Sequence, residues 1–305
     1  DADGAAQRAY KVQFTLDEPT QKKYKGYGID LTQQNTDGTW NLPSPATFVI
    51  DTNGIIQYVF ATWDYKERAT PADVLDAINA GVKAIHCEKP MADTWGGSKR
   101  MAAAAKEKGV QLTFNHQRRY GEPFMIAKQM LDEGAIGDLW RLECGAGNLY
   151  DTGTHFIDMF SFFQGEVPAK WVIGQVDYRK ESLVFGSHNE NQQVVLTEYE
   201  NGVFGLIMTG APGGGRPIPC VNRLIGTDGV IELGVAAGPE VRYRLAGESD
   251  WTAPDTGGAS IHGGCSQPPS RTRLSRPPLA LDHAHPPGSR RRLYPRDAEP
   301  FARTR

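Results

Sequence analysis

The chain has 305 residues, a formal net charge of −3, 39% hydrophobic residues and 23% charged residues. It is long enough for more than one hydrophobic core, and its charge gives no reason to expect a nucleic acid or a lipid surface as a partner. No apolar run approaches the roughly 18 residues of a membrane span, and the start DADGAAQRAYKV lacks the basic region and apolar core of a signal peptide. We therefore expect a cytoplasmic protein without a membrane anchor.

The cysteines are scattered along the chain and form no CxxC pair; they are Cys87, Cys144, Cys220 and Cys265. A disulfide framework or a metal site needs closely spaced ligands. We therefore expect reduced, buried thiols and no bound metal.

Residues 1–73 contain one clear hairpin signal. An apolar strand at 46–50 is followed by the turn sequence Asp51-Thr52-Asn53-Gly54 and by a return strand at 55–60.

Helical and strand patterns alternate in the next part of the chain. Helices that end at glycine and short apolar runs are typical of a strand–helix–strand unit, which pairs its strands in parallel through a right-handed crossover. The expected elements are helices at 73–80 and 94–108, strands at 83–86 and 110–114, and a further helix at 123–133.

Strand patterns dominate from about residue 171. Strands at 193–199 and 203–208 are joined by the turn Glu200-Asn201-Gly202, which predicts an antiparallel sheet in a second domain at 121–258.

Residues 259–305 are dense in Arg and Pro, contain no Lys and show no periodicity, so we expect this tail to be disordered. Its abrupt change of composition also resembles an out-of-frame translation. A nucleic-acid-binding role is disfavoured because the tail has few aromatic residues to stack on bases.

The segment VKAIHCEKPMADT at 82–94 ends a buried strand with a carboxylate and an ammonium beside a proline. In parallel sheets, side chains at the carboxyl ends of strands point into the crevice where ligands bind. Pro90 restricts Lys89 to extended conformations, so the ammonium of Lys89 is directed out of the strand. Taken alone, the Glu88–Lys89 pair is more typical of a solvated surface pair beside a turn proline than of a catalytic site.

Several motifs occur here in the order found in one enzyme family. They are AGVKAIHCEKPMA, VQLTFNHQRRYGEPF (110–124), LDEGAIGDLWRL (131–142), DTGTHFIDMF (151–160), YENGVFGLIMTG and LIGTDGVIELG. From about residue 74 to 260 the chain resembles the Gfo/Idh/MocA (glucose-fructose oxidoreductase/inositol dehydrogenase) family. The resemblance implies an α/β fold: part of a Rossmann NAD(P)-binding domain at 74–120, followed by an open-sheet α+β domain at 121–258.

The same resemblance implies the site residues. Lys89, Asp151 and His155 would be catalytic, with Lys89 near the alcohol, His155 as general base and Asp151 gripping a substrate hydroxyl. The cofactor-binding set would be Glu88, Lys89, Asn115, His116 and Arg118. Without the resemblance, Asp151 could be a helix N-cap and His155 a core histidine. Arg119 reads as structural, and residues 188–190 as either sugar contacts or a solvated loop.

The sequence departs from the family pattern at its start. It contains no Gly-x-Gly-x-x-Gly turn to place a pyrophosphate at a helix N-terminus. In its place, residues 8–77 resemble the C-terminal part of a peroxiredoxin-like (AhpC/TSA, thioredoxin-fold) protein, with Pro45 as the strand-leading proline. This segment has no cysteine before Cys87, so it lacks the thiolate that peroxide reduction needs.

Two functions stay open at this level. One is an NAD(P)-dependent oxidoreductase of a sugar or polyol, impaired by loss of the glycine-rich loop and forming a homo-oligomer through its C-terminal sheet. The other is a non-catalytic chimera that keeps only a substrate-binding or oligomerising domain. A thiol peroxidase is a third, weaker reading.

Overall fold

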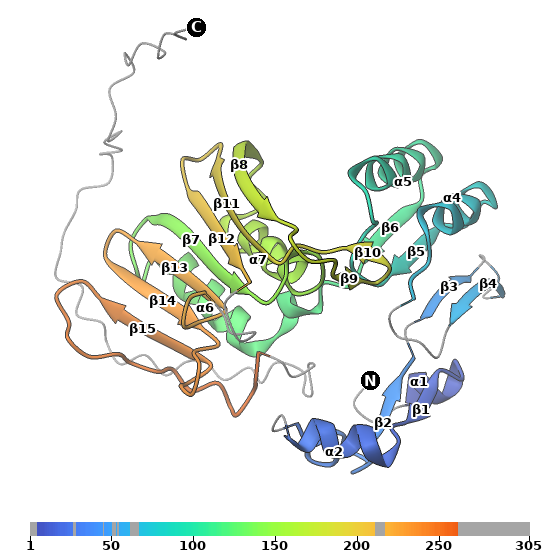
Figure 1. Ribbon diagram of the computed structural model, residues 1–305, viewed down its shortest axis with the longest axis horizontal. Helices are drawn as coiled ribbons and strands as arrows, with labels where there is room; N and C mark the ends of the chain where they lie inside the picture. Colours follow the sequence, from blue (N-terminus) through green and yellow to red (C-terminus); the bar gives the residue numbers. More distant parts are fainter. Residues whose placement is uncertain are drawn as a thin grey trace, which may run out of the picture. The chain divides into compact units, whose positions relative to one another are not determined.

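A computed structural model describes residues 5–26, 29–44, 46–50, 53, 55–61, 67–210 and 217–261 (Figure 1). Several predicted features lie outside these residues: Pro45, most of the turn at 51–54, Cys265 and the tail beyond residue 261.

The N-terminal segment forms two small antiparallel sheets. Strands β1 and β2 pair with each other, and strands β3 and β4 form the predicted hairpin, within one residue of the expected bounds. The thioredoxin-type fold expected for residues 1–73 stays a prediction. The elements are α1 (Ala5–Ala9), β1 (Gln13–Thr15), α2 (Glu18–Gly26), α3 (Leu31–Gln34), β2 (Asn41–Pro43), β3 (Ala46–Ile50) and β4 (Ile56–Ala61).

The strand–helix–strand unit is confirmed. Strand β5 (Ala84–Cys87) pairs in parallel with β6 (Gln111–Phe114), joined by α5 (Trp95–Lys108). Helix α5 begins after a Thr94 cap and ends at Gly109 in the left-handed region, φ 67°. The preceding helix, α4 (Pro71–Asn79), starts at a capping box between Thr70 and Asp73. The predicted domain boundary at 73–74 therefore falls inside a helix.

A small core holds this unit together. Ile78 of α4, Ile85 of β5 and Met101 of α5 are each at most 2% exposed and belong to one apolar cluster. This packing fixes the carboxyl ends of β5 and β6, from which the predicted site residues follow.

The second domain is a seven-stranded sheet with the order β15-β14-β13-β7-β12-β11-β8. Its elements are η1 (Gln117–Tyr120), α6 (Glu122–Asp132), β7 (Leu139–Ala146), η2 (Leu149–Gly153), α7 (Thr154–Gln164), β8 (Ala169–Asp177), β9 (Leu183–Val184), β10 (Ser187–His188), β11 (Gln192–Tyr199), β12 (Phe204–Thr209), β13 (Asn222–Gly226), β14 (Gly229–Leu233) and β15 (Val241–Leu245). The short β9–β10 hairpin stands apart from this sheet.

The expectation of a wholly antiparallel sheet is wrong at one pair, because β7 and β12 run in parallel. Helix α7 returns the chain to the end of the sheet where β7 began, so β8 runs in the same direction as β7. Strand β11 is antiparallel to β8, and β12 is antiparallel to β11. Strand β12 therefore runs in the same direction as β7 and pairs with it in parallel. The sheet is therefore mixed.

Helices α6 and α7 bury one face of this sheet (Figure 1). Phe156, Phe160 and Phe163 of α7 pack in the same cluster as Leu142 of β7 and Phe124 of α6. This cluster fixes the position of α7 and therefore that of His155, which lies in the first turn of the helix.

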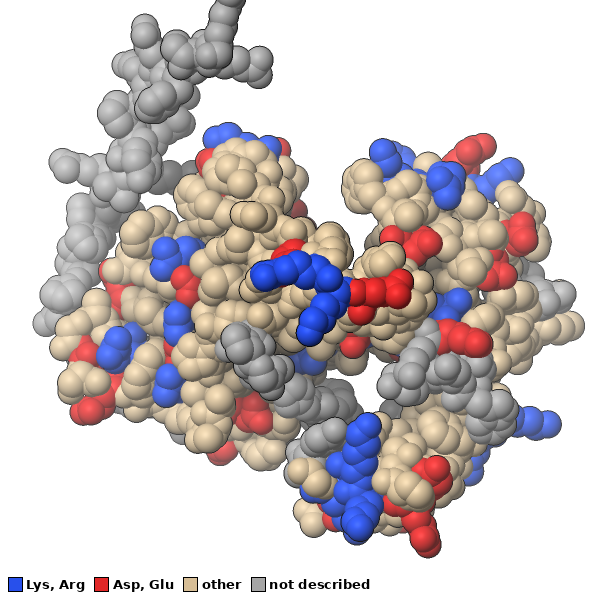
Figure 2. Space-filling model, in the orientation of Figure 1, with Lys and Arg blue, Asp and Glu red and all other residues tan. Residues whose placement is uncertain are grey.

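The other face of the sheet carries a ladder of charges across β7, β13, β14 and β15. Arg223 Nη1 donates to Glu143 Oε2 at 2.9 Å, and Arg223 Nε donates to Glu232 Oε1 at 2.7 Å. Arg242 Nε donates to Glu232 Oε2 at 2.8 Å. Because Glu232 is only 2% exposed, the guanidinium groups of Arg223 and Arg242, and not water, stabilise its negative charge. In Figure 2, basic and acidic side chains lie intermixed over β13 to β15.

The predicted start of the disordered tail, residue 259, is too early. Ile261 is 5% exposed and packs in the core of the sheet domain. Its carbonyl accepts a hydrogen bond from Arg118 Nη1 at 3.1 Å, so residues 259–261 belong to the folded domain.

In the part of the chain that the structure describes, no helix is both long enough and apolar enough to cross a membrane.

Candidate functional site

The carboxyl ends of β5 and β6 lie side by side and place Glu88 next to Asn115. Asn115 N donates to Cys87 O at 2.8 Å, which extends the parallel ladder by one residue. Asn115 Nδ2 then donates to Glu88 Oε1 at 2.6 Å. Two residues of the predicted cofactor-binding set are thus joined directly.

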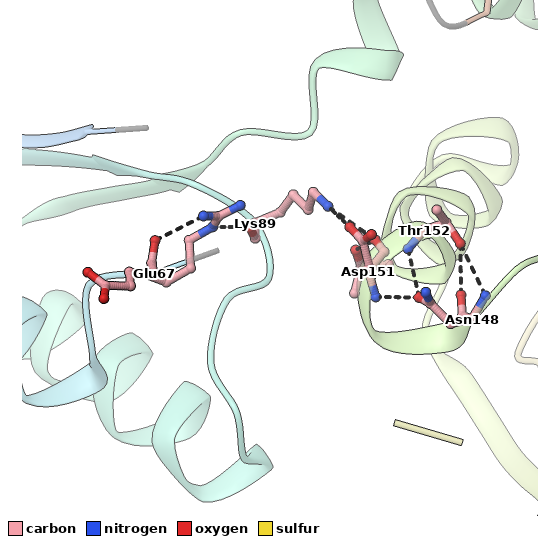
Figure 3. A network of polar contacts seen from close by, with 7 residues as sticks. Glu67, Lys89, Asn148, Asp151 and Thr152 are labelled. Carbon is pink, nitrogen blue, oxygen red and sulfur yellow. Dashed lines mark hydrogen bonds and ion pairs between the residues drawn. The ribbon is translucent and has the colours of Figure 1, made fainter. Parts of the chain in front are cut away.

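Lys89 leaves this edge and pairs with Asp151 on η2, so two predicted catalytic residues meet (Figure 3). The Lys89 ammonium contacts Asp151 Oδ1 and donates to the Asp151 carbonyl at 3.3 Å. Arg68 Nε donates to the Lys89 carbonyl at 3.1 Å, which holds the backbone behind the ammonium. The lysine side chain is 12% exposed and that of Asp151 33%, so the pair can be reached from solvent on the carboxylate side.

Hydrogen bonds to the side chains of Asn148 and Glu190 fix the turn that carries Asp151. The sequence did not predict a role for Asn148 and left that of Glu190 open. Asn148 Oδ1 accepts from Asp151 N at 2.8 Å and from Thr152 N at 3.1 Å. Glu190, 7% exposed, accepts from Leu149 N at 2.5 Å and from Thr209 Oγ1 at 2.7 Å. Asn148 is the N-cap of η2, so an asparagine just before the turn is the local signal that could have identified it. No local signal marks Glu190, because its partners, Leu149 and Thr209, are far from it in the sequence.

His155 lies one turn further along, on α7, and is 5% exposed. Burial, together with the positive charges of Arg118 and Lys89, lowers its pKa to about 3. Desolvation disfavours the imidazolium, so His155 is a much weaker base than a free imidazole, whose pKa is about 6.5. The ring is neutral at neutral pH, and its Nδ1 has no hydrogen-bond partner among the described residues.

His116 packs edge-on against His155, with the ring centroids 5.9 Å apart. Burial lowers the pKa of His116, and the carboxylate of Asp158, 3.8 Å from its Nδ1, opposes that shift. The two histidines therefore bring the end of β6 and the start of α7 together.

The two arginines after His116 differ in role. Arg118 Cζ lies 4.8 Å from the Phe156 ring centroid and its guanidinium bonds the Ile261 carbonyl; its predicted cofactor contact stays a prediction. Arg119 binds Asp158 through Nε at 2.8 Å and also pairs with Glu166, as expected of a structural residue.

Residues 188–190 do not form a solvated loop as a group. The side chain of His188 is 68% exposed, whereas Asn189 and Glu190 are buried. The loop reading is therefore wrong for Asn189 and Glu190, whose side chains face the interior.

Two of the described thiols, those of Cys87 and Cys220, are unsuited to peroxide chemistry. Burial raises the pKa of Cys87 to about 11 and that of Cys220 to about 12. A peroxidatic cysteine needs a lowered pKa, so neither supplies the nucleophile.

Comparisons with known proteins decide the family of this region. Residues 61–116 match the model described as "Oxidoreductase family, NAD-binding Rossmann fold", and residues 117–232 match the "GFO/IDH/MocA C-terminal domain". Residues 61–232 belong to the Gfo/Idh/MocA oxidoreductase family.

Relatives of known name agree with this assignment. Inositol 2-dehydrogenase of Burkholderia multivorans is 33% identical over 145 residues, which are 43% of this chain and 42% of that protein. Inositol 2-dehydrogenase of Burkholderia lata is 34% identical over the same shares. The chain thus covers less than half the length of these Gfo/Idh/MocA relatives.

A solved structure shares the fold. An inositol dehydrogenase homologue from Azotobacter vinelandii, complexed with NADH and myo-inositol, superimposes with a TM-score of 0.51 at 18% identity, over 62% of this chain and 54% of that one. The Gfo/Idh/MocA fold, a Rossmann-like unit followed by a mixed-sheet domain, is therefore present.

Proposed function

We propose that this chain is an NAD(P)-dependent oxidoreductase that acts on a secondary alcohol of a sugar or polyol at Lys89, Asp151 and His155. The Lys89–Asp151 ion pair, with a neutral histidine one turn away, carries the proposal. The inositol dehydrogenases among its relatives support the substrate class.

The residues present fit the nicotinamide end of such a cofactor. Glu88 and Asn115 form a joined carboxylate–amide pair at the carboxyl edge of β5 and β6, where ligands of doubly wound sheets bind. A bound nicotinamide would accept the hydride from the alcohol carbon. Among the described residues, no glycine-rich turn is available for the pyrophosphate.

The side chains then divide the remaining work. The Lys89 ammonium would stabilise negative charge as it develops on the alcohol oxygen. Asp151 would accept a hydrogen bond from a substrate hydroxyl while keeping the ammonium in place. His155, neutral and with Nδ1 unpartnered, would take the hydroxyl proton.

The cofactor affinity of this chain is expected to be far weaker than micromolar, because it lacks the loop that places a pyrophosphate on a helix N-terminus. Titration with NADH, followed by nicotinamide fluorescence, measures this affinity. Replacing residues 1–60 with a complete strand–glycine loop–helix unit, which keeps Arg68 and the Thr70 cap of α4, should bring it into the micromolar range. Micromolar binding by the unmodified chain would show that the loop is dispensable.

The same grafted protein separates the two readings of function. An oxidoreductase should reduce NAD⁺ with at least one member of a polyol panel that includes myo-inositol. A protein that binds NADH and polyols but transfers no hydride would instead be the non-catalytic alternative. The raised pKa values of Cys87 and Cys220 argue against either thiol as the nucleophile of a thiol peroxidase.

We also propose that a second copy of the chain covers the outer strands of the sheet. On the face of the sheet opposite helices α6 and α7, strands β8 and β11 expose Ile173 and Val194, which are 65% and 44% exposed. They are near neighbours, because Val194 pairs with Gln175. Exposed apolar patches of this kind mark protein interfaces.

Sedimentation velocity should show a dimer or larger species, and Ile173→Asp should convert it to a monomer. The control Val59→Asp, at a position 49% exposed on the N-terminal hairpin, should leave it unchanged; a monomeric unmodified chain would contradict the proposal.

A further inference from the structure

The β9–β10 hairpin has an unusual tip. Phe185 and Gly186 connect the two strands, and both have positive φ, 50° and 73°. Two consecutive positive φ values define the tight hairpin turn that normally carries Asn-Gly or Gly-Gly. Phenylalanine in this conformation is strained, and strain of this kind concentrates at functional sites.

The ring of Phe185 lies against the proposed site. Lys89 Nζ is 5.3 Å from the ring centroid, and Arg68 Cζ is 4.5 Å from it. These are cation–π distances. Arg68 also holds the Lys89 carbonyl, so one aromatic ring contacts both the ammonium of Lys89 and the guanidinium that supports its backbone.

The hairpin is also braced from the side of Asp151. The ring of Tyr150, the neighbour of Asp151 on η2, lies 6.2 Å from that of Phe185. Burial raises the pKa of the Tyr150 hydroxyl, and its hydrogen bond to Ser187 on β10 opposes the shift. The hairpin thus contacts η2 through two residues while its tip contacts Lys89.

We infer that Phe185 is a positioning residue, which holds the Lys89 ammonium against Asp151 by covering it with an aromatic face. Without the ring, the four-carbon lysine stem would be free to sample other rotamers, and water would reach the ammonium. The role of Lys89 in hydride transfer rests on the proposed function, but its position does not, so the two can be tested apart.

Chemical labelling of Lys89 tests the inference without any need for activity. The folded chain is treated briefly with an amine-reactive acylating reagent, and mass spectrometry of the digest gives the labelling rates of Lys89 and of Lys170. Lys170 is the internal reference, since it is also ion-paired, at 2.9 Å from Glu198, but has no contact with the hairpin among those the structure describes. Its side chain is 59% exposed and that of Lys89 is 12% exposed, so each lysine is compared with its own rate in the unmodified chain.

Three substitutions separate a positioning role from a merely structural one. Phe185→Leu keeps apolar bulk but removes the aromatic face. Phe185→Asn removes the ring but suits the turn, because asparagine favours positive φ. Phe185→Tyr keeps the ring.

Lys89 labelling should rise by at least roughly two- to five-fold in the Leu and Asn variants. That factor corresponds to losing an exposed cation–π contact, and the Lys89 side chain is only 12% exposed. It should stay at the unmodified rate in the Tyr variant, and Lys170 labelling should not change. The Asn variant should also melt at the same temperature as the unmodified chain or higher, so its gain in Lys89 labelling would not reflect unfolding.

Unchanged Lys89 labelling in the Leu and Asn variants would overturn the inference. So would a parallel rise at Lys170, which would indicate general loosening. If the grafted protein is active, Phe185→Leu should lower kcat more than it raises the KM for the alcohol, and Phe185→Tyr should restore kcat.

Discussion

Replacing His155 by glutamine should lower the rate of hydride transfer by about 10²- to 10⁴-fold, the usual contribution of a positioned acid–base group. Burial lowers the pKa of His155 to about 3, which keeps the ring neutral but makes it a weak base, so we expect the loss to lie near the lower end of this range. Its Nδ1 has no hydrogen-bond partner among the described residues. Glutamine keeps a similar size and hydrogen-bonding capacity but cannot accept the alcohol proton. Single-turnover reduction of saturating NAD⁺ by the grafted protein measures the loss.

His188→Gln is the matched control for this substitution. The side chain of His188 is 68% exposed and its nearest charged contact is Glu181, at 3.8 Å. The same chemical change there should leave the rate unaltered. A His155→Gln variant that transfers hydride at the unmodified rate would remove His155 from the mechanism.

Glu232→Gln should lower the free energy of unfolding by about 3 kcal/mol, as breaking a buried ion pair does. Glu232 is 2% exposed and binds both Arg223 and Arg242, so a neutral amide leaves Arg242 without its carboxylate partner and Arg223 with Glu143 alone. The side chains of Arg223 and Arg242 are each 24% exposed, so water replaces part of the lost interaction. We therefore expect about 3 kcal/mol, the lower end of the roughly 3–5 kcal/mol that breaking a buried ion pair costs. Urea denaturation followed by circular dichroism measures the change.

An exposed pair provides the comparison. Asp132 pairs with Lys128 one helical turn away and is 58% exposed. Asp132→Asn should cost no more than about 0.5 kcal/mol. If the two substitutions have equal effects, the ladder on the sheet contributes no more than a surface pair.

Local signals predicted the first half of the site well. Gly109 in the left-handed region and the Thr94 cap define α5, and the apolar runs on either side of it are β5 and β6. Because these signals act within a few residues, the sequence predicts that Glu88 and Lys89 leave a parallel strand end.

The rest depends on contacts between distant parts of the chain. The parallel pairing of β7 with β12 follows from where α7 returns the chain, which no single segment encodes. Glu190 bonds an amide 41 positions away in the sequence, and Phe185 reaches Lys89 from a hairpin outside the main sheet. A pattern read along one strand or helix contains neither contact.

The pairing of Lys89 with Asp151 also determines the electrostatic field that these two side chains produce at long range. Two opposite charges in contact form a dipole, whose field falls off more steeply than that of either ion. A charged ligand approaching through salt solution would therefore gain almost no long-range steering from this pair, whereas a neutral polyol needs none. Recognition of the alcohol would begin at contact, when a hydroxyl group replaces part of the bond between the two side chains.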